Sequence, residues 1–171
     1  MKNFKSVFMG TAATVAFLCA CSSPQTQTTN LTASGLNPAD FDTVYVDEVK
    51  GEKSVALYTL KNANGMEVCI TNFGGRIVSI MVPDKDGVMQ DVVLGFDKAS
   101  DYFPSNNASD FGAAIGRYAN RIANGVITID DVVYDLPKNN FGHCLHGGCT
   151  LEPAPMGWQN QVFDVEKVTD N

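Results

Sequence analysis

The sequence predicts an all-β fold, either a sandwich or a barrel, and three observations support this class. Short runs in which apolar and polar residues alternate recur from Val44 onward, and this alternation is the period of a half-buried strand. Turn signals such as Asn64-Gly65 and Asp86-Gly87 separate the runs at short intervals. No stretch of eleven or more residues has the periodicity of an amphipathic helix.

The length and composition fit one globular domain. The chain has 171 residues, of which 44% are hydrophobic and 18% are charged, and its formal net charge is -7. A sequence of this kind can build a hydrophobic core. An acidic chain without a basic stripe argues against binding to nucleic acid and against electrostatic docking on anionic lipid. Neutral small molecules, such as sugars, remain compatible with this charge.

Residues 1–20 are predicted to be a signal peptide of the lipoprotein type. Lys2 and Lys5 form a positive start, and the apolar run 7–18 is too short to span a membrane. The run ends in Leu-Cys-Ala-Cys, with Cys21 last, which resembles the site at which bacterial lipoproteins are lipidated. An ordinary secretory signal, or an apolar start that arose by chance, is the alternative. The prediction is a protein held on the bacterial cell envelope, at the periplasmic face or outer membrane, by acyl chains on Cys21.

Residues 21–43 are rich in Ser, Thr, Gln and Asn and are predicted to form a flexible tether, so the domain is placed at 44–171. Three strand pairs are expected in the domain, at 55–60 with 66–71, at 76–82 with 90–95, and at 125–129 with 132–136. A further strand is expected at 162–168. Gly74-Gly75 indicates a bulge or a close approach of two backbone segments.

Three cysteines lie in the predicted domain: Cys69, Cys144 and Cys149. A disulfide between Cys144 and Cys149 is conceivable outside the cytoplasm. The odd number and scattered spacing do not resemble a disulfide framework, so buried free thiols are the preferred prediction.

The stretch 111–148 concentrates the residues best suited to hold a polar ligand. It contains Arg117, Arg121, His143 and His146, which are both of the chain's histidines and two of its three arginines. Arginine offers five donors at any relevant pH, and a neutral histidine can donate, accept or move a proton. Asn120 supplies a donor and an acceptor, which matches a hydroxyl group. Four aromatic residues could offer a flat face to a sugar ring: Phe111, Tyr118, Phe141 and Trp158.

Each of these residues also has a plainer interpretation. A single surface arginine is usually paired with an acid, and a single histidine is more often structural than functional. A metal site made by the two histidines with Cys144 and Cys149 matches no standard zinc spacing, so no metal is predicted. The residues alone therefore indicate a β-rich domain with a site for a polar ligand.

Four segments resemble those of aldose 1-epimerases (galactose mutarotases), in the same order and at similar spacing. They are Asn-Phe-Gly-Gly-Arg-Ile at 72–77, Val-Pro-Asp at 82–84 with Asp-Val-Val-Leu-Gly-Phe at 91–96, Gly-Arg-Tyr-Ala-Asn-Arg-Ile at 116–122, and Leu-His-Gly-Gly at 145–148. The resemblance implies a large antiparallel β-sandwich and an enzyme that interconverts the α and β anomers of free aldoses, such as glucose and galactose, without a cofactor. It also implies that Arg121 and His146 contact the sugar and support catalysis, with Asn120 beside them.

The resemblance further implies that the acid histidine and the base glutamate lie beyond residue 171. None of the chain's five glutamates matches the motif of the base. The chain is therefore predicted to be the N-terminal part of a lipid-anchored aldose 1-epimerase, with an incomplete sandwich, and to be inactive or very weakly active alone. The alternative is a non-catalytic carbohydrate-binding lipoprotein module. A sugar-phosphate epimerase is less favoured, because no additional basic residues accompany Arg121.

Overall fold

The computed structural model describes residues 30–47, 50–106, 109–148 and 157–169. In these ranges the chain forms antiparallel strands and short 3-10 helices, with no α-helix. The described residues include no helix long and apolar enough to cross a membrane. The predicted all-β class is confirmed.

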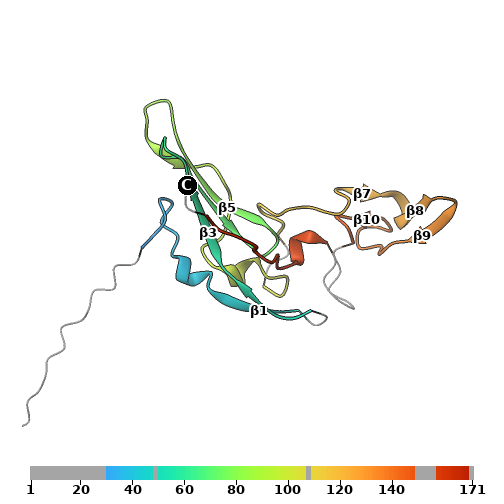
Figure 1. Cartoon of the computed structure of the whole chain (residues 1–171). Helices are drawn as coiled ribbons and strands as arrows, with labels where there is room; N and C mark the ends of the chain where they lie inside the picture. Colours follow the sequence, from blue (N-terminus) through green and yellow to red (C-terminus); the bar gives the residue numbers. More distant parts are fainter. Residues whose placement is uncertain (1–29, 48–49, 107–108, 149–156, 170–171) are drawn as a thin grey trace, which may run out of the picture.

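The main sheet has four strands in the order β3-β4-β5-β6 (Figure 1). Their bounds are Leu57–Lys61, Glu67–Thr71, Arg76–Pro83 and Met89–Asp91. Side chains of the turn residues stabilise the turns between β3 and β4 and between β5 and β6. Asn62 Oδ1 accepts the backbone N–H groups of Asn64 and Met66, at 3.0 and 2.9 Å. Asp84 Oδ1 does the same for the second turn, so both predicted hairpins are confirmed.

Two predicted strands are much shorter than expected, whereas the bounds of the others differ from the prediction by one or two residues. The strand predicted at 90–95 ends at Asp91. The Val92 N–H still donates to the Ile80 carbonyl at 3.1 Å, but the Ile80 N–H donates to Asp91 Oδ1, at 3.0 Å, instead of to a backbone carbonyl. Asp91 Oδ1 also accepts the Val93 N–H at 3.0 Å. The strand predicted at 162–168 is reduced to one bridge, between Val162 and Phe73. Residues 163–169 form no strand.

The N-terminal boundary of the predicted domain is also corrected. Strands β1 (Thr43–Asp47) and β2 (Gly51–Val55) pair with each other, and the 3-10 helix η1 (Pro38–Asp40) precedes them. Phe41 is completely buried and Leu36 is buried beside it in the core. Residues 30–43 therefore do not form a tether, because Leu36 and Phe41 pack into the core and the Ala33 N–H donates to Glu67. Residues 21–29, and the signal-peptide and Cys21 predictions, lie outside the described residues.

The core lies between β1–β2, one face of the main sheet and the 3-10 helix η2 (Ala99–Tyr102). Its buried apolar members are Leu36, Phe41, Val55, Cys69, Phe73, Val78, Ala99 and Tyr102. The predicted close approach at Gly74-Gly75 is confirmed. A Cβ on Gly74 would lie 2.6 Å from the backbone oxygen of Gln159, in the 3-10 helix η4 (Trp158–Asn160).

A buried arginine joins this core to distant segments. Arg76 Nη1 donates to the carbonyls of Ser109 and Phe111, at 3.2 and 3.0 Å, and Nη2 donates to the carbonyl of Gln159 at 3.0 Å. Its guanidinium lies 5.3 Å from the centre of the Tyr102 ring. Arg76 thus fixes the positions of two segments that are remote in sequence, while the aromatic faces help to stabilise its charge.

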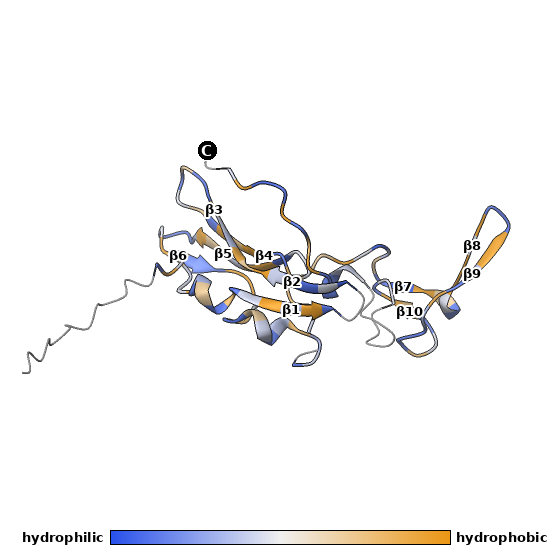
Figure 2. Cartoon of the chain, turned by 60° about the horizontal axis from the view of Figure 1, so that its bottom comes forward, coloured by the Kyte–Doolittle hydropathy of each residue, from blue (hydrophilic) through white to orange (hydrophobic). Residues whose placement is uncertain are grey.

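A second group of strands extends away from the main sheet (Figure 1). Here β7 (Arg121–Ile122) pairs with β10 (Cys144–Leu145), and the 3-10 helix η3 (Ala123–Gly125) leads into β8 (Val126–Ile129). Strand β8 pairs with β9 (Val132–Asp135), which confirms the third predicted hairpin. Figure 2 shows that this hairpin projects from the molecule and is mostly hydrophobic.

Candidate functional site

The short β7–β10 ladder brings Asn120, Arg121 and His146 together. Arg121 is paired with Leu145, and the ladder continues one step further through a bond from the His146 N–H to the Asn120 carbonyl, at 2.9 Å. A second bond runs in the opposite direction, from the Asn120 N–H to Nδ1 of the His146 ring, at 3.1 Å. The two motifs singled out by the sequence are therefore directly linked.

The backbone at both ends of this link is in the left-handed region. Asn120 has φ 59° and His146 has φ 51°. This conformation is uncommon for residues other than glycine, and asparagine and histidine are among those that adopt it most often. Such backbone conformations cluster at functional sites, where the surrounding contacts hold them in place. Here they allow the Asn120 N–H to reach the imidazole ring.

The bond to Nδ1 decides which nitrogen of His146 carries the proton. A nitrogen that accepts a hydrogen bond is unprotonated in the neutral ring, so the hydrogen-bond pattern assigns the proton to Nε2. No described residue makes a hydrogen bond with Nε2. The half-buried ring can therefore donate from Nε2 to a ligand oxygen.

Arg121 is oriented by two amide oxygens. Its Nε donates to Asn140 Oδ1 at 2.9 Å, and its Nη1 donates to Asn120 Oδ1 at 3.1 Å. The side chain is exposed, and its remaining N–H donors make no hydrogen bond with the described residues. Arg121 is therefore a fixed, charged donor that is free to bind oxygen atoms of a ligand.

Two asparagines that support the site were not singled out from the sequence. The Asn139 side chain makes two hydrogen bonds with the backbone of Leu145. Its Oδ1 accepts the Leu145 N–H at 2.8 Å, and its Nδ2 donates to the Leu145 carbonyl at 3.0 Å. Asn140 binds Arg121 as described above. The only sequence signal was an Asn-Asn pair before Phe141-Gly142, which is typical of a loop whose side chains replace backbone partners.

The other predicted residues lie outside this cluster. His143 Nδ1 accepts the N–H of Asn124 at 3.0 Å, which is a structural role. Arg117 is exposed and makes no hydrogen bond with Asn120, Arg121 or His146. No group of three metal-ligating residues occurs among the described residues. Cys69 and Cys144 are buried free thiols, as preferred from the sequence, and Cys149 lies outside the described residues.

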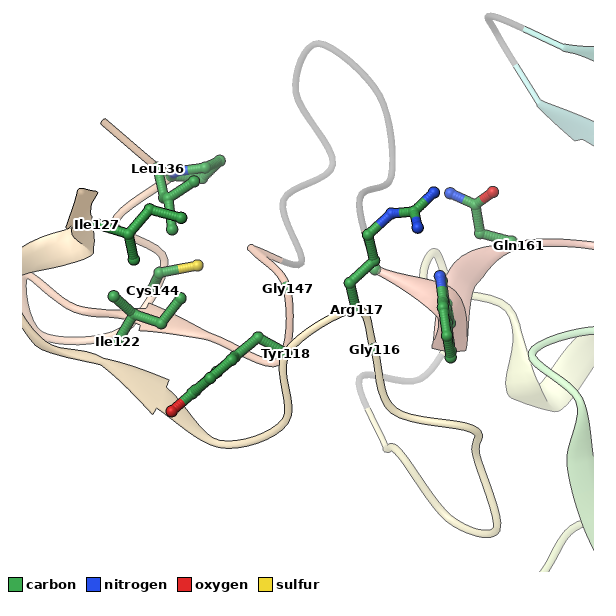
Figure 3. Close-up of a pocket in the computed structure, with 12 residues that line it drawn as sticks. Gly116, Arg117, Tyr118, Ile122, Ile127, Leu136, Cys144, Gly147 and Gln161 are labelled. Atoms are coloured by element: carbon green, nitrogen blue, oxygen red, sulfur yellow. The ribbon is translucent and has the colours of Figure 1, made fainter. Parts of the chain in front are cut away.

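A pocket of about 430 Å³ lies next to the β7–β10 ladder (Figure 3). Ile122 and Cys144, which form the neighbouring cross-strand pair, line it, whereas Asn120, Arg121 and His146 do not. Among the four predicted aromatic residues, Tyr118 and Trp158 line this pocket. Phe111 instead stacks on Phe96, with ring centres 5.8 Å apart, and Phe141 is 95% exposed.

The glycines after His146 make room for the chain itself. Gly147 has φ 80°, and a Cβ there would overlap the carbonyl oxygen of Gly116. A Cβ on Gly148 would lie 3.0 Å from the Pro137 ring. The sequence allowed close approach of either a ligand or another segment, and the structure shows that other segments occupy this space.

No carboxylate completes the site within the described part. Glu67 is buried in β4, where it binds Lys61 at 2.9 Å and accepts the Ala33 N–H at 2.6 Å. Neither Glu52 nor Glu166 makes a hydrogen bond or an ion pair with Asn120, Arg121 or His146 within this part of the chain. The cluster can therefore bind and polarise oxygen atoms, but no described glutamate is coupled to it as a base.

The chain is similar in sequence to known proteins. The sequence profile of a family described as aldose 1-epimerase matches residues 56–170. A probable aldose 1-epimerase of Arthroderma benhamiae is 44% identical over 54% of this chain and 22% of its own length. An aldose 1-epimerase of Escherichia coli is 38% identical over 67% of this chain and 31% of its own length.

The fold is also similar to a solved structure. An aldose epimerase homologue from C. elegans superposes with a TM-score of 0.58 and 30% identity, covering 67% of this chain and 33% of the homologue. The chain thus spans about a third or less of the length of these relatives.

Proposed function

The chain belongs to the aldose 1-epimerase family, and from this we propose that Asn120, Arg121 and His146 form part of the sugar site of an enzyme that interconverts α and β anomers of free aldoses. The observation that carries the proposal is the pair of hydrogen bonds between Asn120 and His146, with Arg121 held beside them by the Asn120 side chain. The remaining N–H groups of Arg121 and the Nε2–H of His146 are donors that make no hydrogen bond with the described residues.

In the proposed reaction, the sugar ring opens to the aldehyde, the bond between C1 and C2 rotates, and the ring closes on the other face. A base removes the proton from the C1 hydroxyl while an acid protonates the ring oxygen, each contributing roughly 10²–10⁴-fold. Arg121 and the Nε2–H of His146 stabilise the negative charge that develops near the ring oxygen. Their alignment before the sugar binds is what makes such stabilisation effective.

The acid histidine and base glutamate implied by the family resemblance are separate from these three residues. The match covers about a third of the relatives' length, and no described glutamate is coupled to Arg121 or His146. We therefore expect the chain starting after Cys21 to bind aldoses weakly and not to accelerate their mutarotation.

The direct test is polarimetry of freshly dissolved α-D-glucose and α-D-galactose. The chain starting after Cys21 should leave the buffer rate unchanged. In a chimera, residues 56–170 replace the matched region of the Escherichia coli relative, and acceleration should return. Arg121→Ala and His146→Ala in the chimera should each lower the acceleration by about 10²-fold.

Two matched variants serve as controls, Arg117→Ala for the arginine and His143→Ala for the histidine. Both residues lie in the same stretch but outside the cluster, so both variants should retain the chimera's rate. Acceleration by the chain alone would contradict the placement of acid and base. A folded chimera that binds galactose without accelerating mutarotation would favour a non-catalytic carbohydrate-binding module.

We also propose that the protein is lipid-anchored through Cys21 on the bacterial cell envelope. The support is the lipoprotein-like sequence that ends at Cys21. Expression in a bacterium with a radiolabelled fatty acid should label the protein, and Cys21→Ser should abolish the label and release the protein from the membrane fraction. Cys19→Ser is the matched control and should remain labelled. Labelling that persists in Cys21→Ser would overturn the proposal.

A further inference from the structure

Gln159 is a fully buried polar residue next to the proposed site. It lies in η4, and its side-chain Nε2 donates to the carbonyl of His146 at 3.3 Å. Its backbone carbonyl accepts from Arg76 Nη2 at 3.0 Å. Gln159 therefore joins the anchor in the core to the backbone of His146.

The position of His146 requires such support. The β10 ladder ends at Leu145, and His146 has a left-handed backbone. Its N–H is held by the Asn120 carbonyl, and its carbonyl is held by Gln159. The peptide groups on both sides of the residue are thus fixed, and the imidazole ring is placed where its Nδ1 meets the Asn120 N–H.

We propose that Gln159 is a positioning residue, which acts through the His146 carbonyl to hold the imidazole against the Asn120 N–H and so keeps the Nε2–H tautomer available to the ligand. The identity of the ligand as a sugar rests on the proposed function. The positioning of the imidazole ring is a property of the protein without ligand. Without the bond from Gln159, the His146 peptide can rotate, the ring loses the Asn120 N–H, and both neutral tautomers become populated.

The test is nitrogen NMR of the two imidazole rings in the full chain, recorded at about pH 8.5, where histidine side chains are ordinarily neutral. In the unaltered protein, His146 should show an unprotonated Nδ1 and a protonated Nε2. Gln159→Met retains the length and most of the volume but removes the donor, and it should shift His146 to a mixture of tautomers.

His143 is an internal control in the same spectra. Its Nδ1 also accepts a backbone N–H, from Asn124 at 3.0 Å, but it has no link to Gln159. A positioning role predicts a change at His146 alone. An unchanged His146 tautomer, or equal changes in both rings, would overturn the proposal, because the second result would mean that Gln159 only stabilises the fold.

A second measurement on the unaltered protein covers the case in which Gln159→Met does not fold. The side-chain amide protons of Gln159 should exchange with solvent much more slowly than those of Gln90, which is exposed. Equal exchange rates would overturn the proposal.

A galactose titration separates this inference from the proposed function. Added sugar should shift the His146 resonances and not those of His143. If galactose shifts neither ring, the sugar function fails for this chain, while the tautomer comparison still decides the role of Gln159. If galactose shifts His146 equally in both proteins and the tautomer is unchanged, the sugar function stands and the positioning role fails.

Discussion

Cys144 is buried and lines the pocket next to the β7–β10 ladder. Burial raises the pKa of its thiol, because the thiolate is poorly solvated there. The thiolate is the reactive form, so we expect Cys144 to be alkylated by iodoacetamide at pH 8 at least about tenfold more slowly in the folded chain than in urea.

The rate is read by mass spectrometry of the peptide that contains Cys144. The urea-denatured chain is the control, since it removes burial while keeping the same residue. Equal rates in the two states would mean that the thiol is accessible. Because the thiol is favoured over the thiolate in the folded state, this residue contributes stability below its ordinary pKa, and the contribution is lost as pH rises through the higher folded pKa.

At the scale of one element, the turn of the β8–β9 hairpin has a backbone conformation that its residues do not favour. Ile129 pairs with Val132, which leaves Asp130 and Asp131 as a two-residue loop, with φ 50° and 61°. These angles are those of a type I′ turn, in which glycine is preferred at the second position. Asp131→Gly should therefore raise the stability by about 0.5–1 kcal/mol, measured as the midpoint of urea unfolding.

The control for this hairpin is Asp131→Ala. Alanine has no polar side chain to favour the left-handed conformation, so it should lower the stability relative to aspartate, giving the order Gly above Asp above Ala. An equal or lower midpoint for the glycine variant would show that the turn is not strained at this position.

The hairpins also show what the sequence could predict. A turn depends on residues close in sequence, such as Asn62 and Asp84, so the three predicted hairpins are confirmed. The β1–β2 hairpin was not predicted. The burial of Phe41 and the end of β6 at Asp91 depend on contacts with distant residues. Such contacts leave no local pattern, which is why both boundaries were wrong.

The same distinction applies to the candidate site. Residue type and family resemblance were enough to single out Asn120, Arg121 and His146. The support from Asn139 and Gln159 could not be predicted. Each side chain acts through a hydrogen bond to the backbone of a residue several positions away, and such a bond leaves no pattern in the sequence.

At the scale of the whole molecule, the β8–β9 hairpin exposes a hydrophobic surface. Five of its apolar side chains are exposed, from 38% at Val126 to 63% at Val133, and the others are Ile129, Val132 and Tyr134. A two-stranded hairpin with both faces in water is marginally stable, and exposed apolar patches favour association.

We therefore expect the chain starting after Cys21 to associate as its concentration rises, as measured by light scattering coupled to size-exclusion chromatography. Salt should strengthen the association, because it screens the repulsion between the acidic chains, whose formal net charge is -9 without Lys2 and Lys5, but leaves apolar contacts intact. Val133→Lys should weaken it by roughly tenfold, since burial of one such side chain is worth about 1.5 kcal/mol.

Ser105→Lys is the matched control, because it adds the same charge at an exposed polar residue away from the hairpin. If the two lysine variants weaken association equally, the effect is one of net charge and the hairpin is not the contact. If the chain stays monomeric at every concentration and salt level, the exposed apolar side chains do not form a self-association surface. A loss of association in Val133→Lys alone would identify the hairpin as the surface through which the chains associate.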